Sequence, residues 1–201
     1  MKKAVDRKPE ERIRREIENT AELLRQLAVA KSEVLLKVAK VISKSLQNGH
    51  TVYFAGNGGS ASQAQHAAGE LVGRFAVDRK GYRAAALTAD TSILTCVAND
   101  YGFEHVFERQ IEAMGRKGDV LVCLSTSGRS PNIILAMESA RRLGITTVAL
   151  TGHGGGQLAG RADYLIDFPQ GPAWHIQELH LVALHILCGE VERELAGKVS
   201  R

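Results

Sequence analysis

The feature that most constrains the fold of this chain is an alternation of short apolar runs with longer helical patterns. Each run is followed by small or polar residues and then by a segment of helical spacing. The runs are TVYFA (51–55), YRAAAL (82–87), DVLVCLS (119–125), ITTVAL (145–150) and DYLIDF (163–168), and the expected helices are 60–74, 91–98, 104–115, 131–143 and 174–195. Strands that alternate with helices predict an α/β fold, with a five-stranded parallel sheet flanked by helices.

The first 48 residues follow a different rhythm. Apolar residues recur at helical spacing from Pro9 to Gln47, and Asn48-Gly49 is a helix-ending signal. This pattern predicts two helices, or one that breaks near residue 30. These helices are more apolar than one shallow domain requires, so we expect oligomer contacts from them. We predict one domain over 1–201, with N-terminal oligomerisation helices at 1–48 and an α/β core at 49–201.

Composition excludes several classes of protein. The net charge of +4 is mild, and its basic excess near the N-terminus, in KKAVDRK and RIRR, is interleaved with acidic residues. That pattern indicates a solvated helix face rather than a nucleic-acid surface. The three cysteines form no CxxC pair, which argues against a disulfide framework and favours a reducing cytoplasm. No apolar run approaches the roughly 20 residues of a membrane span, and the N-terminus lacks the apolar region of a signal peptide.

The first strand is followed by the glycine turn GNGGSA (56–61). Glycines allow a sharp turn close to a ligand, and the N–H groups of the following helix favour an anion. The same letters fit G-x-G-x-x-A, a variant of the dinucleotide fingerprint, which needs an acidic residue about 20 positions later. Asp78 precedes the second predicted strand and Asp90 lies beyond it, so a dinucleotide site fits poorly.

The third strand runs into STSGRSP (125–131), which has four hydroxyl side chains within six positions. Ser130 is the expected N-cap of the next helix, with Pro131 at its first position. Hydroxyls, backbone N–H groups and the helix dipole can all face one phosphate. The alternative is an ordinary Ser/Thr-rich turn. The glycine turn at 56–61, at the end of another strand, argues against this alternative.

Ionisable side chains interrupt two helical segments. The last helix, rich in leucine and valine, contains Gln177, Glu178, His180 and His185. A single histidine on an apolar helix is more often a core residue than a ligand. However, the helix after GNGGSA places His66 and Glu70 at i and i+4, on one face, where both could meet a single ion or substrate.

Together with AND at 98–100, these motifs resemble the sugar isomerase (SIS) domain family and, within it, the phosphoheptose isomerases. They lie in order at four separate places, and the resemblance covers essentially the whole chain. It implies a flavodoxin-like three-layer sandwich and a cytoplasmic homotetramer; from composition and hydropathy we expect neither nucleic acid nor a membrane as a partner. It also implies conversion of D-sedoheptulose 7-phosphate to D-glycero-D-manno-heptose 7-phosphate, the first step towards ADP- or GDP-heptose and lipopolysaccharide precursors.

The resemblance also implies roles for individual residues. The substrate would contact Asn57, Gly58, Gly59, Glu70, Asn99, Asp100, Ser125, Thr126, Ser127, Ser130 and Gln177, with the phosphate held by the hydroxyls of 125–130. One Zn²⁺ per subunit would be bound by His66, Glu70, Gln177 and His185. Glu70 and His185 would also be catalytic. Some relatives instead bind the replication initiator and typically replace this acid and histidine; the chain keeps both, which favours the enzyme over such a non-catalytic protein.

The proposed chemistry raises two difficulties. Moving a proton between C1 and C2 requires a base, for which Glu70 is the candidate, yet a carboxylate bound to zinc is a weaker base. Gln177 and His185 are eight residues apart, roughly 12 Å along a regular helix and about 80° around it. They can hardly meet at one ion unless Gln177 lies in an irregular first turn or different subunits contribute. We therefore predict an active site at a subunit interface, completed by a neighbour's last helix.

Overall fold

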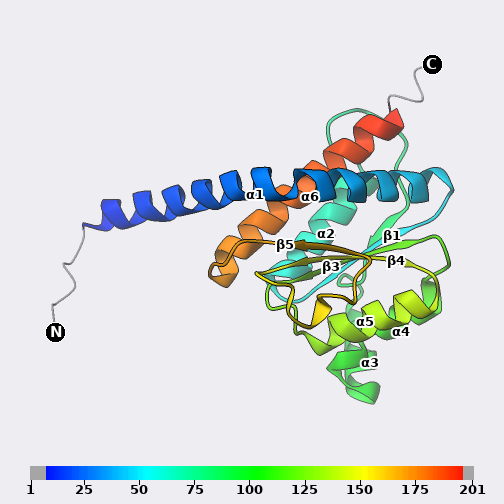
Figure 1. Cartoon of the computed structure of the whole chain (residues 1–201). Helices are drawn as coiled ribbons and strands as arrows, with labels where there is room; N and C mark the ends of the chain where they lie inside the picture. The colour runs from blue at the N-terminus through cyan, green and yellow to red at the C-terminus, as the bar shows by residue number, and fades with distance from the viewer. Residues whose placement is uncertain (1–7, 197–201) are drawn as a thin grey trace.

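Five parallel strands form the sheet at the centre of the molecule, in the order β2-β1-β3-β4-β5 (Figure 1). The computed structural model describes residues 8–196; residues 1–7, with most of the basic KKAVDRK segment, and 197–201 lie outside the described part. The strands coincide with the predicted runs: β1 is Val52–Gly56, β2 Ala84–Ala86, β3 Val120–Ser125, β4 Thr146–Thr151 and β5 Tyr164–Asp167. Every residue of β1 and β3 is buried, as expected for central strands covered on both faces.

Helices cover both faces of this sheet, which confirms the predicted three-layer α/β architecture. One face carries α1 (Pro9–Gln47), α2 (Gly59–Val72) and α6 (Ala173–Ala196). The other carries α3 (Thr91–Tyr101), α4 (Glu108–Met114) and α5 (Pro131–Arg142), with short 3₁₀ turns η1 (Phe103–His105) and η2 (Gly156–Leu158). Side chains alternate along β1 accordingly, since Phe54 packs in the first core cluster and Tyr53 in the second.

The N-terminal segment forms one continuous helix, so the predicted division near residue 30 is wrong. The sequence RQLAVAKSE (25–33) contains neither glycine nor proline, and nothing in it interrupts the i→i−4 hydrogen bonds. The helix ends as predicted: Gly49, at φ +79°, donates to Leu46 O, and His50 N donates to Ser45 O. The first turns of α1 extend beyond the rest of the molecule (Figure 1), and Ile13 and Ile17 are exposed.

Parallel strands place their carboxyl ends at one edge of the sheet, where α2, α5 and α6 begin. Consequently the turns after β1 and β3 and the start of the last helix all lie at this edge. α2 and α6 then run side by side in the same direction, with Gly59 beside Gln177 at one end and Phe75 beside Gly189 at the other. Among the described residues, no helix combines the length and apolar character needed to cross a bilayer.

Candidate functional site

The turn after β1 is built around glycine. Gly58 has φ +55°, and Ser60 N donates to Asn57 O at 3.0 Å. A Cβ on Gly56 would lie 2.7 Å from Ser60 O, so the backbone is too close for a side chain there. The Asn57 side chain is paired with the buried Asn132 of α5, each amide donating to the other at 2.9 Å. This pair joins the first glycine turn to the segment after β3 and leaves one Asn57 side-chain N–H free of that pairing.

The hydroxyl-rich turn after β3 brings two of its side chains together. Ser125 Oγ and Ser130 Oγ lie 3.2 Å apart, and Arg129 N donates to Ser127 Oγ at 3.2 Å. Gly128, at φ +61°, closes the turn by donating to Ser125 O. Ser130 is the N-cap residue of α5, as expected, but its side chain makes no capping hydrogen bond. The N–H groups at the start of α5 therefore have no side-chain acceptor from Ser130, and such groups attract an anion.

The glycine loop after β4 is hydrogen-bonded to the hydroxyl-rich turn, whereas no such bond is found for residues 99–100 within the described part of the chain. Thr126 O accepts from Gly152 N at 3.0 Å, which fixes the glycine loop after β4 against the hydroxyl turn. Asn99 and Asp100 lie on the exposed last turn of α3 and bond to each other at 2.8 Å. Within residues 8–196 no hydrogen bond connects them to the turns at 56–60 or 125–130.

Three ionisable side chains converge between α2 and α6. His66 Nε2 lies 2.7 Å from His185 Nε2 and 3.4 Å from Glu70 Oε1. One ligand atom from each residue can be chosen so that all three lie within 4.8 Å of one another. We call these residues the His66–Glu70–His185 trio. His185 comes from the chain's own α6, so a neighbour's last helix is not needed to bring the second histidine to the first.

Gln177 lies apart from the trio. A Cβ built on Gly59 would lie 2.8 Å from Gln177 Oε1, so the amide covers the first residue of α2. His66 is seven residues further along, about 10 Å by helical rise and on the same face. α6 is helical from Ala173 onwards, so no irregular first turn brings Gln177 closer. Within one protomer, the expected four-ligand set is therefore divided between Gln177 at the sheet edge and the trio two turns away.

The donor set of the trio suits a metal ion. Two imidazole nitrogens and a carboxylate are acceptable zinc ligands, and three protein ligands with an open fourth position are typical of catalytic zinc. A tetrahedral ion would hold the two nitrogens about 3.3 Å apart, so a small rotation of the rings from their 2.7 Å contact is enough. His66 is 43 % exposed, which leaves one side of the site accessible.

Comparisons with known proteins identify the family. Residues 17–152 match the SIS domain family. The phosphoheptose isomerase of Akkermansia muciniphila is 50 % identical over 187 residues, which cover 93 % of this chain and 98 % of that protein. The chain belongs to the phosphoheptose isomerase family. The family's enzyme from Burkholderia pseudomallei is 52 % identical over 162 residues, covering 81 % of this chain and 82 % of that protein.

Solved structures of phosphoheptose isomerases share this fold. The structure from Francisella tularensis has a TM-score of 0.90 and 33 % identity, and covers 93 % of this chain and all of that chain. The structure from Neisseria gonorrhoeae has a TM-score of 0.87 and 37 % identity, covering 92 % and 99 %. The SIS fold predicted from the motifs is thereby confirmed.

Two other ionisable residues of this phosphoheptose isomerase family member, Asp90 and His180, contribute to the fold and lie outside the trio. Asp90, considered for a dinucleotide ribose, is the N-cap of α3 and accepts from Ile93 N. His180 is fully buried, with its ring 4.9 Å from that of Phe168. Burial lowers the pKa of His180 to about 4, despite an opposing contribution from the backbone of Thr151.

Glu178 belongs to a cluster between α1 and α6. It lies 2.9 Å from His175 Nδ1 and accepts from Thr20 at 2.8 Å. Hydrogen bonding to Glu178 is the largest effect on His175 and raises its pKa above the ordinary value. The cluster fixes the start of α6 against α1 and lies outside the trio.

Sequence reasoning missed two buried residues beside the trio, Arg79 and Glu192. They form an ion pair at 2.8 Å in which both side chains are less than one-tenth exposed. The sequence does not indicate that they are buried or paired, because Arg79 lies in a charged stretch and Glu192 among the polar positions at the end of a helix.

Proposed function

We propose that this chain is an aldose–ketose isomerase that converts D-sedoheptulose 7-phosphate to D-glycero-D-manno-heptose 7-phosphate, the first step towards nucleotide-activated heptose. The observation that carries the proposal is the His66–Glu70–His185 trio, assembled on a fold whose strand ends bear a hydroxyl-rich turn. Similarity to phosphoheptose isomerases that are about 50 % identical to this chain supports the same activity. Retention of the acid and the histidine argues against the alternative, a non-catalytic protein that binds the replication initiator.

The chemistry requires two proton transfers. Interconversion of a ketose and an aldose passes through an enediol, with one proton moving between C1 and C2 and another between O1 and O2. Glu70 is proposed as the base for the carbon proton, and His185 as the group that moves the oxygen or ring-opening proton. Their contact with His66 restricts both side chains, which favours a fixed reacting geometry.

Zinc is proposed at the same trio, one ion per subunit, held by His66, Glu70 and His185. A bound ion would stabilise negative charge on the enediolate oxygens. Gln177, from the first turns of α6 and beside Gly59, is proposed as a substrate contact together with Asn57, Gly58 and Gly59. Asn99 and Asp100, on the exposed last turn of α3, are also proposed as substrate contacts.

The phosphate is proposed to bind at the turn after β3. Ser125, Thr126, Ser127 and Ser130 provide hydroxyls, and the start of α5 provides backbone N–H groups. No lysine is needed, because the partial positive charge at a helix start already favours an anion.

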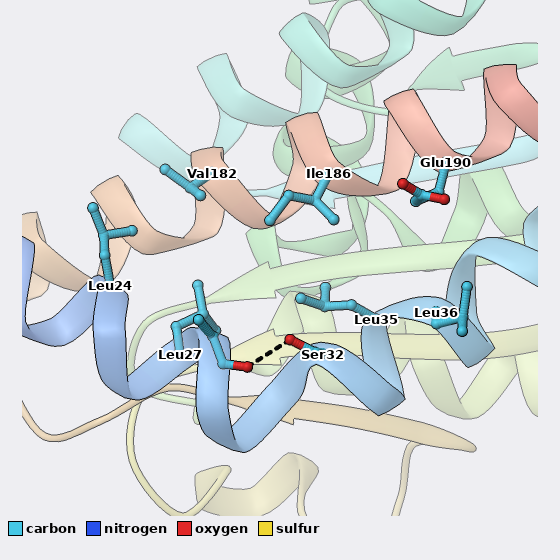
Figure 2. Close-up of a pocket in the computed structure, with 9 residues that line it drawn as sticks. Leu24, Leu27, Ser32, Leu35, Leu36, Val182, Ile186 and Glu190 are labelled. Carbon is cyan, nitrogen blue, oxygen red and sulfur yellow. Dashed lines mark hydrogen bonds between the residues drawn. The ribbon is translucent and has the colours of Figure 1, made fainter.

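We propose a cytoplasmic homotetramer whose active sites lie at subunit interfaces, formed by a single 1–201 domain with α1 as its oligomerisation helix. An apolar groove between α1 and α6 is lined by Leu24, Leu27, Leu35, Leu36, Val182 and Ile186 (Figure 2). Exposed Val72, Phe75 and Ile186 adjoin the trio in sequence or by contact. A second copy of the chain would cover this apolar surface. Within one protomer the sheet-edge residues lie about 10 Å from the trio, and the second copy could bring its own sheet-edge residues closer.

The decisive experiment is an isomerisation assay on sedoheptulose 7-phosphate, with product identified by NMR, for protein as purified, after chelator treatment and after zinc is restored. We expect turnover that falls on chelation and returns with zinc. Unchanged turnover after verified metal removal would refute the zinc proposal alone. A native tetramer with no turnover in any arm would refute the isomerase and favour the binding protein.

A further inference from the structure

The loop at 73–80, which follows α2, is bound by a carboxylate from α6. Glu192 is 2 % exposed, yet it accepts backbone N–H groups from Phe75 at 3.0 Å, Ala76 at 2.7 Å and Val77 at 2.9 Å. Three successive N–H groups thus point at one buried side chain. Backbone N–H groups of the loop therefore hold it to the last helix.

Arg79, from the same loop, extends this contact to α2. Its Nε donates to Glu192 Oε2 at 2.8 Å, while its terminal nitrogens donate to Glu70 O and Leu71 O, both at 2.9 Å. The guanidinium also lies 3.9 Å from the centre of the Tyr82 ring. The last carbonyls of a helix have no partner within it, and here the Arg79 side chain bonds to two of them.

The Glu192 carboxylate is buried, and both of its oxygens are hydrogen-bonded. Burial alone would raise the pKa of Glu192, but hydrogen bonds from Val77, Ala76, Phe75 and Arg79 outweigh it and keep the pKa below its ordinary value. Glu192 is therefore a carboxylate at neutral pH, with each oxygen accepting two hydrogen bonds. Removing either member would leave the other charge buried without its partner, which is strongly unfavourable.

This ion pair connects the two helices that bear the trio. Arg79 bonds to the backbone of Glu70 itself, and Glu192 lies two turns beyond His185 on the same face of α6. The ring of Phe75, whose N–H donates to Glu192, lies 5.9 Å from the His185 ring. A shift of α2 along α6 would therefore separate Glu70 from His185 and break this network as well.

We propose that Arg79 and Glu192 are positioning residues of the His66–Glu70–His185 site, which hold Glu70 on α2 and His185 on α6 at the spacing that one ion requires. The proposal rests on the proposed function of the trio. Neither residue belongs to the group of side chains that could hold the ion. Residues that orient metal ligands typically affect metal affinity or activity 10- to 100-fold when changed.

The test uses two variants of the full-length protein. Glu192→Gln keeps the shape but replaces one acceptor oxygen by a donor, and Arg79→Lys keeps the positive charge but cannot bond to Glu192 and both carbonyls at once. Zinc affinity is measured by competition with a chromophoric chelator, and kcat and KM with sedoheptulose 7-phosphate. We expect zinc binding about 10- to 100-fold weaker and a matching fall in kcat. KM should change less than about twofold, because the phosphate turn adjoins neither residue.

A control separates positioning from general loss of stability. Ile111 is fully buried in the core cluster on the opposite face of the sheet, so Ile111→Val lowers Tm without disturbing α2 or α6. It should leave zinc affinity and kcat unchanged. If both test variants lower Tm yet keep wild-type zinc affinity and kcat, the pair is purely structural and the proposal is overturned.

Failure of the proposed function would look different. Wild-type protein without turnover refutes the isomerase, while zinc affinity of the metal-free protein still tests the positioning role. Should wild type also bind no zinc, the ring ¹⁵N signals of His66 and His185 decide, because their 2.7 Å contact depends on the spacing of the helices. Shifts in both variants, absent in Ile111→Val, would support the positioning role, and unshifted rings would overturn it.

Discussion

The burial of His180 predicts a loss of stability in mild acid. The imidazole is fully enclosed, and neither ring nitrogen has a hydrogen-bond partner of acceptable geometry among the described residues. Burial holds its pKa at about 4 in the folded protein, against 6.5 for an exposed histidine. Because the folded pKa is the lower one, the unfolded chain takes up this proton first as the pH falls. The stability that neutral His180 provides is therefore complete above about pH 6.5 and is lost between there and about pH 4.

The magnitude follows from the difference in pKa. Each unit corresponds to about 1.4 kcal/mol, so a folded value near 4 gives a loss of about 2 kcal/mol between pH 7 and pH 5 and about 3 kcal/mol by pH 4. His175 acts in the opposite sense. Since its pKa is raised, its contribution is present below pH 6.5 and is lost as the pH rises through the folded value.

The measurement compares wild type with His180→Leu by urea unfolding at pH 7, 6 and 5, at one fixed protein concentration. Leucine fills a similar space and cannot titrate, while His175 is common to both proteins and cancels in the difference. We expect the wild type to lose about 2 kcal/mol more than the variant over this range. If the two proteins show the same dependence on pH, His180 is not held neutral by burial and the reasoning fails.

Three further substitutions test the site. Glu70→Gln should lower kcat by about 10²-fold or more while inorganic phosphate still raises Tm, and a wild-type rate would exclude Glu70 as the base. Gly128→Ala should lower the free energy of unfolding in urea more than Gly160→Ala, because an added Cβ at Gly128 would meet a carbonyl of the loop after β4, whereas Gly160 faces open space. Both glycines have positive φ, +61° and +73°, and that conformation alone costs about 1–2 kcal/mol. Equal losses would show that the close approach at Gly128 is unimportant. Asn132→Leu should cost about 1–3 kcal/mol by leaving Asn57 without its buried partner, and should raise KM; unchanged values of both would contradict a role for the pair.

The strands and most helices could be predicted because each depends on local patterns. Buried parallel strands appear as continuous apolar runs, and the turn residues between them mark their ends. The expected break in α1 was wrong because the change in apolar rhythm near Val29 marks a solvent-facing stretch of the helix, where Val29 is 91 % exposed, and not a change in backbone. Helical propensity continued across it.

The site was predictable where one element supplies it and less so where two must meet. His66 and Glu70 share a helix face by spacing alone. Their partner on α6 depends on how far the two helices are shifted along each other, which no local pattern records. His180 and His185 are about 140° apart around α6, so that one faces the core and the other the trio. The Arg79–Glu192 contact likewise depends on a loop folding against a helix 113 residues away.

The turn at 125–131 has a consequence for how binding would respond to acidity. Its hydroxyls and backbone N–H groups carry no ionisable proton near neutrality, and its one charged side chain is the guanidinium of Arg129. A phosphate held there would change its affinity with pH only through its own second ionisation, near pH 6. Above about pH 7 the affinity should be flat, so any further change in turnover with pH would report on the proton-transferring side chains and not on capture of the substrate.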